Sequence, residues 1–70
     1  MEKFAVRLKE LRAEKKIAQK DLAERLGVTV RAYRYYEEGK RFPDFQGLLI
    51  LADCFQVSLD YLAGRTDERA

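Results

Sequence analysis

Hydrophobic residues recur along the chain at the three- and four-residue spacing of α-helices, in five separate segments. This pattern predicts helices over residues 2–16, 19–26, 30–38, 45–55 and 59–63. The first four have apolar stripes that can face one core: Phe4, Leu8 and Leu11; Leu22, Ala23 and Leu26; Ala32, Tyr33 and Tyr36; and Leu48, Leu51, Ala52 and Phe55. The expected fold class is therefore all-α.

Residues that begin and end helices separate these segments. Gly27 and Gly39 follow the second and third helices, and glycine readily takes the left-handed conformation that terminates a helix. Thr29, Asp44 and Ser58 stand just before the last three helices, where a side-chain oxygen can accept a backbone N–H. The second and third helices should therefore be short and joined by a tight turn.

Seventy residues allow one domain. Cys54 is the single cysteine, which rules out an internal disulfide, and a zinc site has no histidine to draw on. The net charge is only +2, but residues 1–20 carry seven Lys or Arg against three Glu, whereas residues 44–70 carry two against five acidic residues. This asymmetry favours one face for an anion, although ordinary solvated helix faces would give it too.

Several function classes lack their usual residues. There is no Gly-rich phosphate loop, and the carboxylates are spread over helices rather than paired. We expect no enzyme activity, catalytic residue, cofactor, metal or small-molecule substrate. No apolar run approaches the roughly 20 residues that span a bilayer, and no signal peptide is evident, so we expect no membrane partner and a cytoplasmic location.

Residues 19–39 form a short helix, a turn with glycine, and a helix rich in Arg and Tyr, which is typical of a DNA-binding helix-turn-helix. The motifs RLKELRAEK, LAERLGVT, YEEGKRFP, LLILAD and VSLDYLAG follow one another over residues 4–64. In this order and spacing they resemble the Cro/phage-repressor, or lambda-repressor-like, helix-turn-helix family.

The resemblance implies a compact five-helix domain over residues 1–64, with the helix-turn-helix at its second and third helices. It also implies sequence-specific binding of double-stranded DNA, regulation of transcription as a repressor, and a homodimer on an inverted-repeat operator. Residues 65–70 are expected to be a frayed, charged tail.

By the same resemblance, the third helix enters the major groove and reads bases with Val30, Arg31 and Tyr35, with Thr29 and Arg34 at the margin. Arg31 can present two N–H groups to O6 and N7 of a guanine. Val30 can only meet a thymine methyl group or exclude a base by shape. Tyr35 can pack on a thymine methyl group or reach a phosphate with its hydroxyl.

Gln19, Lys40 and Arg41 are the expected contacts to the DNA backbone, which give affinity but no sequence information. The resemblance also implies an ion pair between Arg12 and Glu37 that clamps the first helix to the recognition helix. Without the resemblance, Arg12 can also be interpreted as a side chain that lies along the apolar surface and extends its charged end into solvent.

Two positions depart from good helix design. Ala18 stands where the family usually has Ser or Thr as the N-cap, and the missing oxygen should cost on the order of 1 kcal/mol. Gly47 lies inside the fourth helix, where glycine is unfavourable by about 1 kcal/mol relative to alanine.

Several alternatives stay open at this stage. Tyr33 and Tyr36 are interpreted as core residues with hydroxyls at the rim, against a rival interpretation as a stacking platform for single strands. Phe42 can pack against Phe45 or against a partner subunit. Of the residues of the last helix, one can contribute to a dimer contact: Leu59, Tyr61 or Leu62.

The alternative function is a protein-interaction module on the same helical fold, with an apolar docking patch made of Val30, Tyr35 and Phe42. An antitoxin combines the two, because it binds both DNA and a toxin.

Overall fold

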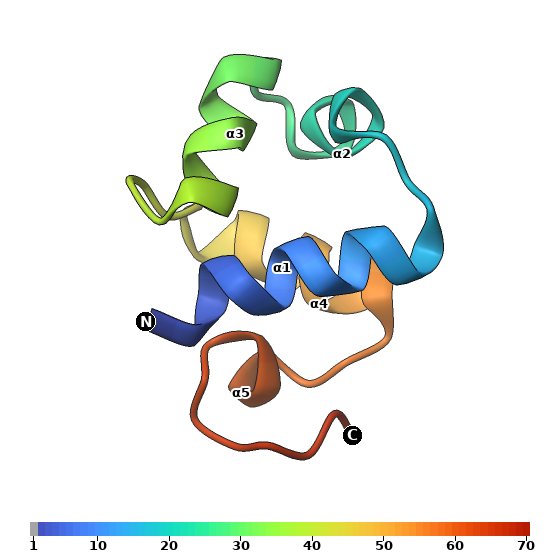
Figure 1. Cartoon of the computed structure of the whole chain (residues 1–70), viewed down its shortest axis with the longest axis vertical. Coiled ribbons are helices and arrows are strands. Elements are labelled where there is room, and N and C mark those ends of the chain that lie inside the picture. Colours follow the sequence, from blue (N-terminus) through green and yellow to red (C-terminus); the bar gives the residue numbers. More distant parts are fainter. Residues whose placement is uncertain (1) are drawn as a thin grey trace.

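The computed structural model describes residues 2–70 and has five helices and no strand in that range (Figure 1). The helices are α1 Glu2–Lys15, α2 Gln19–Leu26, α3 Val30–Glu38, α4 Phe45–Phe55 and α5 Leu59–Leu62. The predicted all-α fold is confirmed, with two ends moved by one residue. α1 ends at Lys15 because Lys16 takes a left-handed φ of 56°, and α5 ends at Leu62 rather than at residue 63.

The turn between α2 and α3 is built by Gly27 and Thr29, as the sequence predicts. Gly27 has a φ of 71° and donates its N–H to the carbonyl of Glu24 at 3.1 Å, which ends α2. Thr29 accepts the N–H of Ala32 at 3.0 Å, which begins α3. Because both ends of the turn are closed by hydrogen bonds, α2 and α3 are held in a defined relation.

α1 is the central element of the fold. In Figure 1 it crosses the middle of the molecule, with α2 and α3 above it and α5 and the C-terminal segment below. It packs against α3, α4 and α5. Its predicted stripe is fully buried, since Phe4, Leu8 and Leu11 are each at most 1% exposed. The core therefore forms around one face of α1.

Gly47 has a packing reason that the sequence did not reveal. It is buried near the start of α4, and a Cβ atom added there would lie 2.8 Å from the Cβ of Pro43. The same turn is closed by Asp44, whose carboxylate accepts the N–H of Gly47 at 2.8 Å. The absence of a side chain thus lets the chain before α4 fold tightly against the helix.

The C-terminal segment, residues 65–70, which we expected to be a frayed tail, makes several contacts with the rest of the protein. Residues 65–70 fold back over α1, where Arg69 forms two hydrogen bonds to the carboxylate of Glu14 at 2.7 and 2.9 Å. The carbonyl of Arg69 also accepts the N–H of Ser58 at 2.7 Å. Of the four charged side chains in this segment, Asp67 and Arg69 are paired with charges on α1, and Arg65 is paired with Asp60 of α5.

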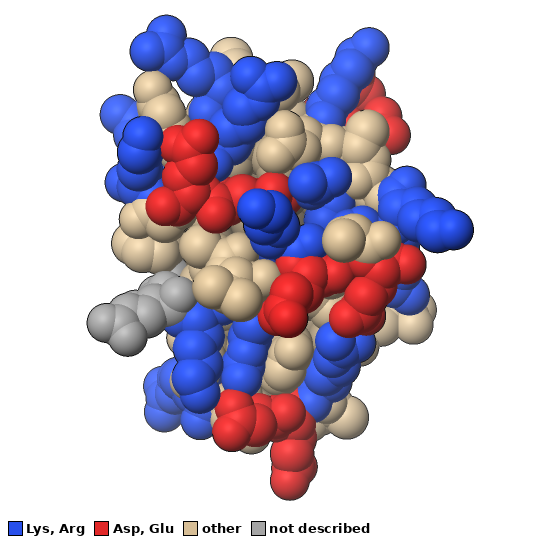
Figure 2. Space-filling model, in the orientation of Figure 1, with Lys and Arg blue, Asp and Glu red and all other residues tan. Residues whose placement is uncertain are grey.

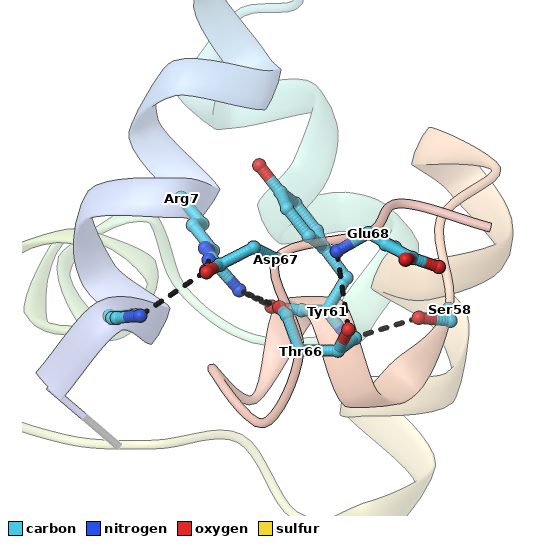
Figure 3. A network of polar contacts seen from close by, with 7 residues as sticks. Arg7, Ser58, Tyr61, Thr66, Asp67 and Glu68 are labelled. Atoms are coloured by element: carbon cyan, nitrogen blue, oxygen red, sulfur yellow. Dashed lines mark hydrogen bonds and ion pairs between the residues drawn. The ribbon is translucent and has the colours of Figure 1, made fainter.

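Arg7 is the anchor for this segment (Figure 3). Arg7 is only 9% exposed, and its guanidinium donates to the carbonyls of Tyr61 and Thr66 and to the carboxylate of Asp67. It also lies 4.1 Å from the centroid of the Tyr61 ring. Since a buried guanidinium needs hydrogen-bond partners, Arg7 requires the tail to lie where it does.

The sequence leaves alternatives open for Phe42 and the last helix, on which the structure bears in part. Phe42 is half-exposed and packs edge-on against Phe4, with ring centroids 5.9 Å apart, rather than against Phe45. In α5, Tyr61 and Leu62 are buried in the core, which leaves Leu59 at the surface as a half-buried residue.

We predict that Gly47→Ala destabilises the protein by about 1–3 kcal/mol, although alanine is the better helix former. The added methyl group must displace Pro43, whose Cβ belongs to a rigid ring. Urea unfolding followed by circular dichroism measures the change. Asp53→Ala, at an exposed site of the same helix, is the control and should change the free energy of unfolding by less than about 0.5 kcal/mol. A Gly47→Ala variant more stable than the parent would contradict the packing argument.

Candidate nucleic-acid interface

α3 has a buried face and an exposed face. Tyr33 and Tyr36 are 0% and 9% exposed and pack edge-on with ring centroids 6.1 Å apart. Arg31 and Arg34 are exposed on the other side, and Tyr35 is half-buried between the two faces. The core assignment of Tyr33 and Tyr36 is therefore confirmed. A stacking platform of three tyrosines is excluded, because two of the rings are inside the core.

The hydroxyl of Tyr33 is buried, although we expected it to lie at the rim of the core. It donates a hydrogen bond to Oε2 of Glu37 at 2.6 Å, one helical turn along α3. Burial is the main cause that raises the pKa of the Tyr33 hydroxyl, and the hydrogen bond to the Glu37 carboxylate raises it further. The i, i+4 spacing of the two residues was the available signal, but it does not distinguish a buried pair from a surface pair.

Glu37 receives hydrogen bonds from three helices. Arg12 on α1 donates to both carboxylate oxygens, at 2.5 and 3.2 Å, and Gln19 on α2 donates at 3.1 Å. Tyr33 supplies the contact from α3 itself. The Glu37 side chain is 5% exposed and the Arg12 side chain 21%. The ion pair that the family resemblance implied is thus present, and it joins α1, α2 and α3 at one carboxylate.

The partners of Glu37 outweigh the effect of its burial. Burial alone raises the pKa of this carboxyl group, but the hydrogen bonds from Arg12, Tyr33 and Gln19 together bring the pKa below its ordinary value. In turn, the hydrogen bond to Glu37 raises the pKa of the Arg12 guanidinium. The pair is therefore charged at neutral pH.

Gln19 has both ends of its side-chain amide engaged inside the protein. Its Nε2 donates to Glu37, and its Oε1 accepts the Nε–H of Arg34 at 3.3 Å. Ala18 has the extended conformation of an N-cap but no side-chain hydrogen bond to the first turn of α2. The start of α2 therefore presents backbone N–H groups that no side chain caps, which is an arrangement suited to an anion.

The first turn of α3 contains one exposed and one half-buried candidate. Thr29 is exposed, and because its hydroxyl oxygen accepts the N–H of Ala32, its hydrogen is left to donate outward. Val30 is half-buried and packs against the core, so only part of its side chain faces solvent.

The loop after α3 brings further cations to the same face. Lys40 and Arg41 are exposed, and each has its charged group 5.8 Å from the centroid of the Tyr35 ring. Lys40 also forms an ion pair with Glu38 at 3.3 Å, with both side chains largely in water. The structure thus brings together Arg31, Tyr35, Lys40 and Arg41, while Gln19 and Arg34 form a second group beside Glu37.

The surface charges are uneven. Figure 2 shows Lys and Arg side chains projecting at the upper end of the view, over α2 and α3, whereas acidic and basic side chains alternate around α1 and below. Within residues 2–70, no helix is long and apolar enough to cross a membrane, and no group of acidic or cysteine side chains is arranged to hold a metal ion.

The sequence profile of the helix-turn-helix family matches residues 8–62, which is most of the chain. The chain belongs to the helix-turn-helix family. It is 32% identical to the solved DNA-binding domain of the P22 C2 repressor, with a TM-score of 0.77 over 86% of this chain and 79% of that one. The predicted lambda-repressor-like fold is thereby confirmed.

Curated relatives of this helix-turn-helix chain are longer than it is. It is 42% identical over 67 residues to the uncharacterized HTH-type transcriptional regulator YqaE of Bacillus subtilis, covering 94% of this chain and 58% of YqaE. It is 36% identical over 52 residues to the cryptic phage CTXphi transcriptional repressor RstR of Vibrio cholerae, covering 71% of this chain and 46% of RstR. The chain thus spans about half the length of these relatives.

We predict that Ala18→Ser stabilises the helix-turn-helix by about 1 kcal/mol, because the new hydroxyl can accept an N–H of the first turn of α2. The backbone at Ala18 already has the φ of −72° and ψ of 148° that a cap requires. Urea unfolding measures the gain. Ala13→Ser, at an exposed position inside α1, should instead be neutral or slightly destabilising. Equal effects at both sites would rule out capping as the cause.

A second prediction concerns how the free energy of unfolding depends on pH. The lowered pKa of Glu37 means that this carboxylate stabilises the fold fully above the ordinary carboxyl pKa of 4.5, and loses that effect as the pH falls through 4.5 to its lower value in the folded protein. Glu37→Gln should reduce the free energy of unfolding at pH 7 by about 1–3 kcal/mol. The difference from the parent should shrink below pH 4.5, as measured by urea unfolding at a series of pH values.

Glu38→Gln is the matched control for this experiment. Glu38 is the next residue along α3, its side chain is 48% exposed, and its ion pair with Lys40 lies in water. An exposed pair contributes at most about 1 kcal/mol. If the two variants had the same effect at pH 7, the network around Glu37 would not have the structural role that we assign to it.

Proposed function

We propose that this helix-turn-helix domain binds double-stranded DNA sequence-specifically, with α3 in the major groove, and regulates transcription. The observation that carries the proposal is the outer face of α3, on which exposed Arg31 and Arg34 flank Tyr35 while the helix is tied to α1 and α2 through Glu37. A rigid helix with cationic side chains on its free face suits the groove of a polyanion.

Arg31 is the base-reading residue that we assign first. It is exposed in the first turn of α3, the part of a recognition helix that lies nearest the base edges. Its guanidinium can donate two hydrogen bonds to O6 and N7 of a guanine. Val30 offers a partly exposed apolar surface to a thymine methyl group, with Thr29, Arg34 and Tyr35 as the remaining candidates at this face.

Backbone contacts come from two places that flank α3. The loop cations Lys40 and Arg41 neutralise phosphates after the helix. Gln19 lies before it, at the start of α2. Because its amide is engaged by Glu37 and Arg34, we assign the phosphate contact at this site to the backbone N–H groups of the first turn.

We assign the mode of regulation to repression through occupation of an operator. The P22 C2 protein and RstR are both repressors, and the first is solved as a DNA-binding domain. The proposed assembly is a homodimer on an inverted repeat, to which Leu59 can contribute as the apolar residue of α5 that is only half-buried. The matched segments cover only 58% of YqaE and 46% of RstR, so further segments can share in dimerisation there.

The alternative of a protein-interaction module has less support from the geometry. Its docking patch would need Val30, Tyr35 and Phe42 to form one apolar surface. Instead Val30 packs against the core, Phe42 packs against Phe4, and Tyr35 lies among cationic groups. A surface of this composition favours a polyanion over an apolar partner.

Selection of bound duplexes from a random pool tests the proposed function. We expect enrichment of an inverted repeat with half-sites about one helical turn apart. Binding to that site should weaken steeply with salt, because each neutralised phosphate releases counterions and contributes a slope of about −0.9 in log–log form. A folded protein that enriches no duplex would refute the proposal, and a single enriched half-site would refute the dimer.

Arg31→Ala tests the assignment within that site. We expect a loss of about 1–3 kcal/mol confined to one base pair of each half-site, measured by competition among all four base pairs at each position. Arg65→Ala removes an exposed arginine from the C-terminal segment and should leave the ranking unchanged. If Arg31→Ala kept the parent ranking at every position, base reading by Arg31 would be excluded.

A further inference from the structure

Tyr35 is surrounded by cationic groups from two different elements. The guanidinium of Arg31, on the first turn of α3, lies 5.9 Å from the centroid of its ring. The charged groups of Lys40 and Arg41, in the loop after α3, each lie 5.8 Å from the same centroid. The negative face of an aromatic ring attracts cations at these distances, so one ring gathers three like charges that would otherwise repel one another.

The hydroxyl of Tyr35 makes a directed contact with only one of them. The Nε–H of Arg31 donates to this hydroxyl oxygen at 3.1 Å, across one turn of the helix. This bond uses the nitrogen nearest the aliphatic stem and leaves both terminal nitrogens of the guanidinium unengaged by it. Those two nitrogens form an edge that can donate in parallel to O6 and N7 of a guanine.

The main chain of Tyr35 fixes the loop as well. Its carbonyl oxygen accepts the N–H of Lys40 at 2.9 Å and the N–H of Arg41 at 3.4 Å, where Gly39 turns the chain away from the helix. The loop that bears the two cations is therefore attached to the same residue whose ring lies near their charged groups. Backbone and side chain of Tyr35 together link the loop to the base-reading turn of α3.

We infer that Tyr35 is a positioning residue, which orients Arg31 toward a guanine and keeps Lys40 and Arg41 beside it, rather than a residue that reads a base itself. The inference rests on the proposed function. A free arginine side chain loses rotamer freedom when it binds, and one already held in place loses less. Tyr35 thereby links sequence reading by α3 to phosphate binding by the loop.

Tyr35→Phe separates this role from a direct contact. Phenylalanine keeps the ring, and with it any packing on a thymine methyl group and the attraction for Lys40 and Arg41, but removes the hydroxyl that holds Arg31. We expect discrimination at the base pair read by Arg31 to fall about two- to tenfold, the range that one hydrogen bond supports. Discrimination at the other positions and the salt slope should stay as in the parent.

The measurement is competition binding among the four base pairs at each position of the selected site. Tyr36→Phe is the matched control, because it removes a hydroxyl from the adjacent core tyrosine. It should leave the discrimination unchanged. In the double variant Arg31→Ala with Tyr35→Phe, discrimination should be no worse than in Arg31→Ala alone, because the hydroxyl acts only through Arg31.

The outcomes separate the inference from the proposed function. If the parent selects a site and Arg31→Ala relaxes it, but Tyr35→Phe behaves like the parent, the inference is overturned and the proposed function stands. A uniform loss of affinity in Tyr35→Phe, equal at all base pairs, also overturns it, since that marks a structural or direct backbone role. If the parent protein selects no duplex, both the inference about Tyr35 and the proposed function are refuted.

Discussion

The carboxylate of Glu37 is the point on which the arrangement of the first three helices depends. A charged group that is 5% exposed needs partners, because desolvation costs several kcal/mol per ion. Here the partners come from α1, α2 and α3, in the form of Arg12, Gln19 and Tyr33. These hydrogen bonds tie the relative positions of the three helices to one carboxylate. The main effect of this hydrogen-bond network is therefore to fix how α1, α2 and α3 are placed relative to one another, rather than to add to the net free energy of unfolding.

The exposed charges of the interface cannot define a geometry in this way. The pair between Lys40 and Glu38 is mostly solvated, and such pairs contribute about 0–1 kcal/mol. A long side chain held by so little samples many rotamers. The position of the loop cations is therefore set by the main-chain hydrogen bonds to Tyr35 and by its ring. The candidate interface thus combines two features. The buried carboxylate of Glu37 fixes α3 against α1 and α2, and Tyr35 keeps the cationic groups of Lys40 and Arg41 near the exposed face of α3.

Local features of this fold could be predicted from the sequence, because they depend on neighbours in the chain. The helices follow from hydrophobic spacing, and Gly27, Thr29, Asp44 and Ser58 begin or end them as expected. The pair between Arg12 and Glu37 joins residues on different helices, so periodicity does not reveal it, and it came from family resemblance. The DNA contacts assigned to α3 and its loop likewise rest on that resemblance and stay predictions.

The features that the sequence missed depend on where side chains lie in three dimensions rather than on their spacing along the chain. Arg7 belongs to a helix whose charges look like an ordinary solvated face, yet it is buried against the tail. Gly47 looks like a defect until Pro43 is placed beside it. Arg7 and Glu14 are seven residues apart and share one face of α1, where they hold the C-terminal segment, while Arg12 faces α3. α1 is thus a common support for α3 and for the C-terminal segment.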